Sequence, residues 1–251
     1  MNKIKTGDTF KNNEGCEFVV IDYINHSKIL IKFQDVYEFE KFTDAKSIRL
    51  GNIKNLYFKS ILGIGFLGVG SYVANVKRRP TKAYSLFLSM FNRCYSEKYQ
   101  EKQPTYIGCS VAPEWHNFQN FAKWFDINNL KCGINYQLDK DILVKGNKIY
   151  SPDTCCFVPK EINSLLLNNK AKRGKFPLGV WFEKDKFISA CHNKGKQIYI
   201  GSFDTPEEAF EAYKIYKENL IVEIAKEYFE QDLISFDVYK ALLNYKIEIT
   251  D

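Results

Sequence analysis

The first fifty residues show alternating apolar and polar positions, the pattern of short β-strands. Two β-branched and aromatic runs, residues 18–23 and 28–33, flank Asn25-His-Ser, which has the composition of a turn. A third run ends at Ile48-Arg-Leu-Gly. We therefore predict a small antiparallel β-barrel over residues 1–55.

Residues 56–80 are rich in glycine and aromatic residues and follow neither the helical nor the strand period, which predicts a linker. Gly63, Gly65 and Gly68 have the spacing of a dinucleotide-binding loop. That loop must open a helix within a strand–helix–strand unit. The residues between Gly68 and Pro80 have no helical pattern, so nucleotide binding is not expected.

Helical periodicity appears in three later stretches, each with apolar residues three or four positions apart. The first stretch contains Tyr84, Phe87, Leu88 and Phe91. The second contains Trp115, Phe118, Phe121, Ala122 and Phe125, and the third contains Leu233, Phe236, Tyr239, Leu242 and Leu243. They predict two helices with aromatic core faces inside a module of residues 81–170, and a C-terminal helix in residues 231–251.

Residues 137–163 have the pattern strand, turn, strand, helix. Gly146-Asn147 is a typical hairpin turn, and Ser151-Pro-Asp predicts a second turn. Pro159 suits the first turn of a helix that runs to Asn168.

This stretch resembles the HNH (ββα-metal) endonucleases, in particular the homing endonucleases of phages. The resemblance rests on Asp139 at a strand end, Ser151-Pro152 at a turn and Asn163 on a helix, and it covers residues 83–170. In that family the Asp and the helix residue hold a divalent metal at the scissile phosphate. The resemblance thus implies that Asp139, Asp141 and Asn163 bind Mg²⁺ or Mn²⁺.

Lys140 stands where the HNH family has its general-base histidine, within the implied catalytic set of Asp139, Lys140 and Asn163. A solvent-exposed lysine is protonated at neutral pH and cannot take a proton from water, although burial beside another cation could lower its pKa. Two interpretations remain open: a DNA endonuclease, and a degenerate scaffold that binds DNA without cutting it.

The seven cysteines include no CxxC pair, which favours reduced thiols in the cytoplasm over a disulfide framework. The candidates for structural zinc are Cys94, Cys109, Cys155 and Cys156. Adjacent residues of a strand point in opposite directions, so Cys155 and Cys156 do not form a close ligand pair. Buried thiols are therefore expected here, and structural zinc is not.

Residues 176–203 show three short apolar runs separated by Asp185-Lys186 and Lys194-Gly-Lys196, which predicts a three-stranded sheet. Thr205-Pro-Glu-Glu208 then carries an N-cap, a proline at the first helical position and the acidic residue of a capping box. The apolar stripe of the following helix is formed by Ala209, Tyr213, Tyr216 and Leu220.

This order of three strands and a helix resembles the Apetala-two/ethylene-response-factor DNA-binding domain. The residues that carry the resemblance are Gly179-Val180, Lys186-Phe187, Ile200-Gly201-Ser-Phe203 and Thr205-Pro-Glu-Glu-Ala209, within a domain of residues 171–230. The family contacts DNA with the sheet face that points away from its helix.

Strand alternation predicts which residues lie on each face of this sheet. Val180, Phe182, Phe187, Cys191, Ile198 and Ile200 are expected to face the helix. The resemblance implies that DNA is contacted by Trp181, Lys184, Lys186, His192, Lys194, Lys196, Gln197 and Tyr199.

Composition changes this interpretation only modestly. The net charge of +6 permits binding to a polyanion, and the excess of lysine over arginine favours contacts with the phosphate backbone. No apolar run is long enough to span a membrane. We therefore expect an α+β protein of the cytoplasm that binds double-stranded DNA. The alternative is a nonenzymatic phage regulator or host-defence antagonist that binds DNA or a host protein, and Lys140 favours that alternative.

Overall fold

The computed structural model describes residues 3–129, 134–166 and 175–250. The fold is mixed α+β with several small sheets, as predicted. The chain divides into two compact units, the first formed by residues 1–126 and 149–152 and the second by residues 127–148 and 153–251. The stretch predicted as one central module is thus divided between the two units.

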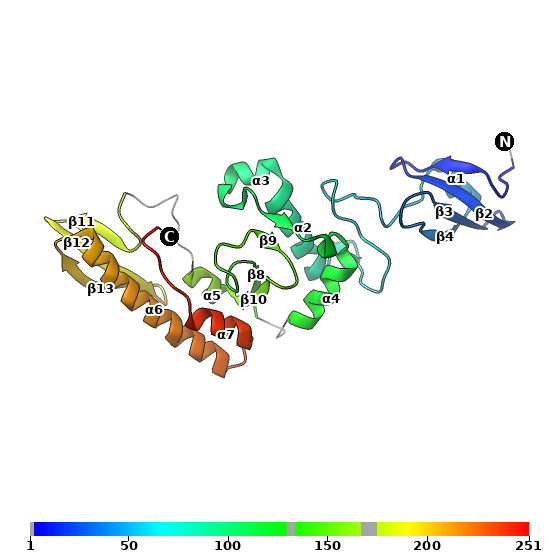
Figure 1. Ribbon diagram of the computed structural model, residues 1–251. Helices are drawn as coiled ribbons and strands as arrows, with labels where there is room; N and C mark the ends of the chain where they lie inside the picture. The colour runs from blue at the N-terminus through cyan, green and yellow to red at the C-terminus, as the bar shows by residue number, and fades with distance from the viewer. Residues whose placement is uncertain (1–2, 130–133, 167–174, 251) are drawn as a thin grey trace. The chain divides into compact units, whose positions relative to one another are not determined.

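The first unit begins with a four-stranded antiparallel sheet of order β1-β2-β3-β4, drawn in blue in Figure 1. Its strands are β1 (Thr9–Lys11), β2 (Glu17–Asn25), β3 (Lys28–Phe33) and β4 (Glu40–Thr43). One face of the sheet covers an apolar core of Ile4, Phe18, Val20, Ile29, Ile31, Phe33, Ala45, Ile48 and Ile53. Alternation of apolar and polar residues along β2 and β3 produces this one-sided burial.

The predicted closed barrel is wrong. Within the described part of the first unit, β1 pairs only with β2 and β4 only with β3, so the sheet stays open. The predicted third run ends instead in helix α1 (Ala45–Leu50). Asp44 caps this helix by accepting a 2.9 Å hydrogen bond from the Ser47 amide, and Gly51 ends it with a left-handed φ of 67°. These caps direct the chain into a helix, which leaves no further strand to close the sheet.

The segment predicted as a linker is packed against the helical part of the first unit. The side-chain amide of Gln119 donates to the carbonyls of Leu67 and Tyr72 and accepts from the Tyr72 amide. Gly68 has a φ of +69°, and a Cβ there would lie 2.0 Å from Asn117 Oδ1, so only glycine fits. Residues 52–80, all of them described, contain the two-stranded β5 (Asn75–Val76) and β6 (Arg79–Pro80) and no helix.

Two aromatic-rich helices follow, as predicted: α2 (Lys82–Tyr95) and α4 (Phe118–Asn128). Their buried aromatic rings pack on one another, as in Phe87 against Phe118 and Phe121. Between the helices lie α3 (Glu97–Lys102), η1 (Pro104–Tyr106), β7 (Ser110–Val111) and η2 (Pro113–His116). β9 (Ile149–Tyr150) returns to pair with β7 in parallel and completes the first unit.

The second unit begins with two antiparallel strands, β8 (Tyr136–Asp139) and β10 (Cys156–Pro159), followed by helix α5 (Lys160–Leu165). The predicted hairpin at Gly146-Asn147 is wrong, because β8 pairs with β10 and not with a strand directly after that turn. The Asp139 side chain accepts hydrogen bonds from the backbone N–H groups of Asp141 and Ile142, and these bonds turn the chain out of the strand. The predicted end of α5 at Asn168 lies outside the described residues.

The C-terminal sheet has the order β11-β12-β13, with β11 (Val180–Glu183), β12 (Lys186–Asn193) and β13 (Lys196–Phe203). Helix α6 (Pro206–Glu230) lies along one face of this sheet, and α7 (Phe236–Leu243) packs on α6 (Figure 1). The predicted capping box is confirmed, since Thr205 and Glu208 exchange hydrogen bonds. No helix among the described residues is both long and apolar enough to cross a membrane.

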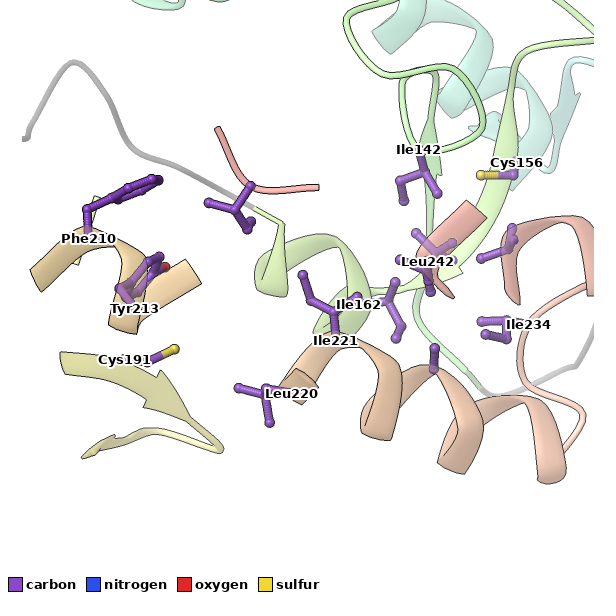
Figure 2. Close-up of a cluster of buried hydrophobic side chains, with 14 of the residues drawn as sticks. Ile142, Cys156, Ile162, Cys191, Phe210, Tyr213, Leu220, Ile221, Ile234 and Leu242 are labelled. Atoms are coloured by element: carbon purple, nitrogen blue, oxygen red, sulfur yellow. The ribbon is translucent and has the colours of Figure 1, made fainter. Parts of the chain in front are cut away.

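A single apolar cluster joins these elements of the second unit. Figure 2 shows Ile162 of α5 beside Ile221 of α6, with Cys191 of the sheet facing the same helix. The predicted stripe of α6 is confirmed: Ala209, Tyr213 and Leu220 are buried in the cluster, and Tyr216 packs against it. The three-stranded sheet is therefore held to its helix by one face.

Candidate functional site

The outer face of the C-terminal sheet brings together four of the predicted DNA-contacting side chains. The register pairs Trp181 with Ile188, Tyr199 with Ala190, and Gln197 with His192. Since Val180 and Cys191 belong to the buried cluster, alternation places Trp181 and His192 on the opposite face. His192, Gln197 and Tyr199 are exposed, with Tyr199 at 63%, whereas Trp181 is half-buried and donates to Glu183 Oε2 at 3.2 Å.

The residues predicted to face the helix lie on that side of the sheet, including Ile198, which pairs with Cys191. Val180 and Cys191 are buried in the cluster, and Phe187 and Ile200 pack against it. Phe182 pairs with Phe187 and so lies on the same face, although it is 50% exposed. It lies in the edge strand β11, next to the turn at residues 184–185, where its ring contacts Phe187 at a centroid distance of 5.0 Å.

The predicted lysines lie around this face in different electrostatic settings. Lys184 is in the first hairpin turn, and its side chain is 90% exposed. Lys186 Nζ lies 2.5 Å from Asp204 Oδ1, a hydrogen bond that raises the Lys186 pKa. Lys194 Nζ is 3.4 Å from Glu227 Oε2, and Lys196 is exposed. Ion pairs of exposed side chains are weak, so a phosphate group can compete with these carboxylates.

The carboxylates predicted for the central module lie at the end of β8. Asp139 Oδ1 accepts the backbone N–H groups of Asp141 and Ile142, both at 2.8 Å. Burial, together with the nearby Asp141 carboxylate, raises the pKa of Asp139 to about 6. The two carboxylates therefore lie side by side at the start of the loop between β8 and β10.

Lys140 is buried beside these carboxylates, with only 8% of its surface exposed. Its Nζ donates to Asp141 Oδ2 and to the backbone carbonyl of Asn147, each at 2.9 Å. The side-chain Nδ2 of Asn147 donates in turn to the backbone carbonyl of Lys140 at 2.6 Å. Donation to a carboxylate stabilises the ammonium form, which has no lone pair for a proton from water. In this position Lys140 acts as a hydrogen-bond donor that closes the loop.

The predicted metal ligand Asn163 donates from its side-chain nitrogen to Gln137 Oε1 at 2.6 Å. Gln137 precedes Asp139 by two positions in β8, so both lie on the same side of the strand. Among the described residues, no three His, Cys, Asp or Glu side chains gather into a metal-binding group. The zinc candidates Cys94, Cys109, Cys155 and Cys156 are all buried.

The sequence interpretation did not identify Lys217, which lies in the wall of a cavity of about 710 Å³ in the second unit. Its side chain is buried, and desolvation lowers its pKa. A signal was present in the sequence: Lys217 follows Tyr213 by four positions and precedes Leu220 by three, within the apolar stripe of the helix.

No family model, curated protein or solved structure matches this chain.

Proposed function

We propose that the second unit binds double-stranded DNA through the outer face of β11, β12 and β13. The observation that supports this proposal is the grouping of Trp181, His192, Gln197 and Tyr199 on one sheet face, with lysines around it. β-Strands of other proteins enter DNA grooves with such a face, where polar side chains reach base edges and lysines contact phosphates.

The side chains on this face suggest how binding energy and sequence preference are divided. Gln197 is the residue best suited to read adenine through its amide, while the rings of Trp181 and Tyr199 suit apolar contact with thymine methyls or sugars. Residues 174–251 contain no arginine, the side chain that most often reads guanine. Most of the affinity should therefore come from lysine–phosphate contacts, which release counterions and depend steeply on salt.

Metal-dependent cleavage by the central module is the second candidate function. It is favoured by the strand–strand–helix order of β8, β10 and α5, with Asp139 at the end of the first strand. The ion pair of Lys140 with Asp141 favours the nonenzymatic alternative. Lys140 stands in the position of the general base, but its ammonium donates a hydrogen bond and has no lone pair to accept a proton. Binding of Mg²⁺ or Mn²⁺ by Asp139, Asp141 and Asn163 stays a prediction.

A mobility-shift titration of the full chain with duplex DNA at several salt concentrations tests the proposal. Lys196→Gln should lower the slope of log affinity against log salt by about 1, and Tyr199→Ala should weaken binding. The matched control is Lys226→Gln, because Lys226 is an exposed lysine of α6 away from the sheet face. Affinity that does not change with salt, or equal losses in Lys196→Gln and Lys226→Gln, would overturn the proposal.

The same samples, incubated with plasmid and Mg²⁺ or Mn²⁺, address the second candidate. Nicking by the native chain that disappears in Asp139→Ala would establish a working site without the histidine. Intact plasmid alongside a salt-dependent shift would support the nonenzymatic DNA-binding function. If no shift is seen even at low salt, the host-protein alternative replaces both.

A further inference from the structure

A cavity lies on the helix side of the C-terminal sheet, between α5, β12 and α6. Its volume is about 710 Å³, and all the lining residues that are described belong to the second unit. Apolar walls come from Leu165, Leu178 and Ile224. Cavities of this volume accommodate small organic ligands, whose orientation is typically fixed by a few polar groups.

Lys217 is a buried cation in the wall of this cavity. It is 8% exposed, and in the described part of the chain no carboxylate forms an ion pair with it. Burial lowers the pKa of its ammonium, and the side chain of Cys191 across the helix–sheet interface acts in the opposite direction. Buried charges in proteins are normally paired, so an unpaired lysine facing a cavity indicates that an anion completes the site.

The strand opposite Lys217 contributes further buried polar atoms. Ser189, Cys191 and Asn193 occupy alternate positions of β12, and Cys191 is seen facing α6 in Figure 2. Ser189 Oγ and Asn193 Oδ1 are buried, and neither has a hydrogen-bond partner among the described residues. Asn193 also lines the cavity. A ligand that donates a hydrogen bond to Asn193 would satisfy an acceptor that the described residues leave unsatisfied.

The remaining charges of the cavity lie at its rim. Lys160 and Glu161, at the start of α5, are both exposed, so water screens them. Lys194, also exposed, is paired with Glu227. The buried positive charge of Lys217 therefore dominates the interior, and it is surrounded by apolar walls.

We infer that this cavity binds a small organic anion, with an apolar body that carries either a carboxylate or a phosphate monoester. The anionic group pairs with Lys217, and a hydrogen-bond donor of the ligand points at Asn193. The cavity lies on the helix side of the sheet and the proposed DNA-binding surface on the other side, and His192 and Lys194, near the β12–β13 turn, contribute to both.

Fluorescence titration of the full chain with the anionic probe 8-anilinonaphthalene-1-sulfonate tests the inference. The neutral probe N-phenyl-1-naphthylamine, which lacks the sulfonate, serves as its matched partner. The native chain should bind the anionic probe saturably, and Lys217→Met should weaken that binding at least about tenfold while affinity for the neutral probe changes little. Lys226→Met, the exposed control on the same helix, should behave as the native chain.

A competition experiment on the native chain keeps the test independent of the variant's folding. Octanoate and octyl phosphate should displace the anionic probe, whereas octanol, with the same alkyl chain and no charge, should displace it far less. The relative strength of octanoate and octyl phosphate distinguishes a carboxylate site from a phosphate site. No saturable binding, equal loss of both probes in Lys217→Met, or equal displacement by octanol and octanoate would each overturn the inference.

Discussion

Lys140 and Lys217 are equally buried lysines of the second unit, and their surroundings differ completely. Each is 8% exposed. The ammonium of Lys140 donates to a carboxylate and a carbonyl of its own loop. Lys217 faces a cavity and has no such acceptor among the described residues. At the same burial, Lys140 therefore closes its loop by hydrogen bonds, whereas the ammonium of Lys217 lacks a partner among the described residues.

Buried polar groups that are hydrogen-bonded within the chain have a structural role, whereas buried polar groups without such partners indicate a binding site. Around β8 the hydrogen bonds are made within the chain: Asp139 accepts two amides, and Asn163 donates to Gln137. A polar cluster that satisfies itself stabilises its loop and loses little when no ligand is present. In the C-terminal cavity, Ser189 Oγ and Asn193 Oδ1 have no hydrogen-bond partner among the described residues. Replacing each lysine by methionine should therefore change the free energy of unfolding in opposite directions.

The largest effect is expected for Lys140→Met. The substitution keeps the length of the side chain but removes the donor to Asp141 Oδ2 and to the Asn147 carbonyl. Breaking a buried charge pair from one side costs roughly 3–5 kcal/mol, and the half-exposed Asp141 reduces the expected loss to about 3 kcal/mol. Hydrogen exchange of the β8 and β10 amides measures this local stability. A loss no larger than that of Lys226→Met would show that the loop does not depend on Lys140.

A smaller effect is expected from the pH dependence of Asp139. Its folded-state pKa of about 6 lies above the ordinary value of 3.8, so the folded chain binds this proton more tightly than the unfolded chain. Stability from this group is therefore present at about pH 4 and is lost as the pH rises towards 6, by about 2 kcal/mol. Asp139→Asn keeps an oxygen for the two amides and should abolish this loss.

Denaturant unfolding at pH 4.5 and pH 7.5 measures the effect of Asp139→Asn. The control is Asp185→Asn, because Asp185 lies in an exposed hairpin turn that asparagine also adopts. The native chain and this control should lose the same stability between the two pH values, and Asp139→Asn should lose less. An identical pH profile for Asp139→Asn would mean that Asp139 titrates as an exposed carboxyl group does.

The sequence predicted those elements whose signals are local. Thr205 and Glu208 define the start of α6 within four residues, and alternation in β12 and β13 defines the two faces of the sheet. The cap signals of α1 are also local, Asp44 at one end and Gly51 at the other, but the apolar pattern between them predicts a strand. In this segment the caps decide the structure and the hydrophobic pattern does not.

The features that escaped prediction depend on pairings distant in sequence. Gly146-Asn147 is a typical hairpin turn, yet β8 pairs with β10, which comes after β9 in the sequence. A lysine in an apolar stripe can direct its ammonium to solvent or retain it inside. Packing of α5 and the sheet against α6 decides this for Lys217, and no local pattern encodes that packing.

Lys217→Met should have the smallest effect, and its sign should be opposite to that of Lys140→Met. Replacing a buried cation that has no carboxylate partner among the described residues by an apolar side chain of similar length is neutral or stabilising, here by about 1 kcal/mol at neutral pH. Since burial lowers the Lys217 pKa, the unfolded chain binds this proton more tightly than the folded chain. The native chain therefore gains stability as the pH rises towards the ordinary lysine value of 10.5, and the advantage of Lys217→Met should shrink along the same range.

The measurement is denaturant unfolding of the native chain, Lys217→Met and Lys226→Met at pH 7.5 and pH 9.5. It gives the stability of Lys217→Met relative to the native chain at each pH. The comparison between the two buried lysines fails if Lys217→Met destabilises the second unit as Lys140→Met does. Such a loss would mean that the Lys217 ammonium makes a stabilising contact within the chain. A stabilised Lys217→Met that no longer binds the anionic probe would instead show that the native chain retains this charge at a cost to its own stability, as a binding group requires.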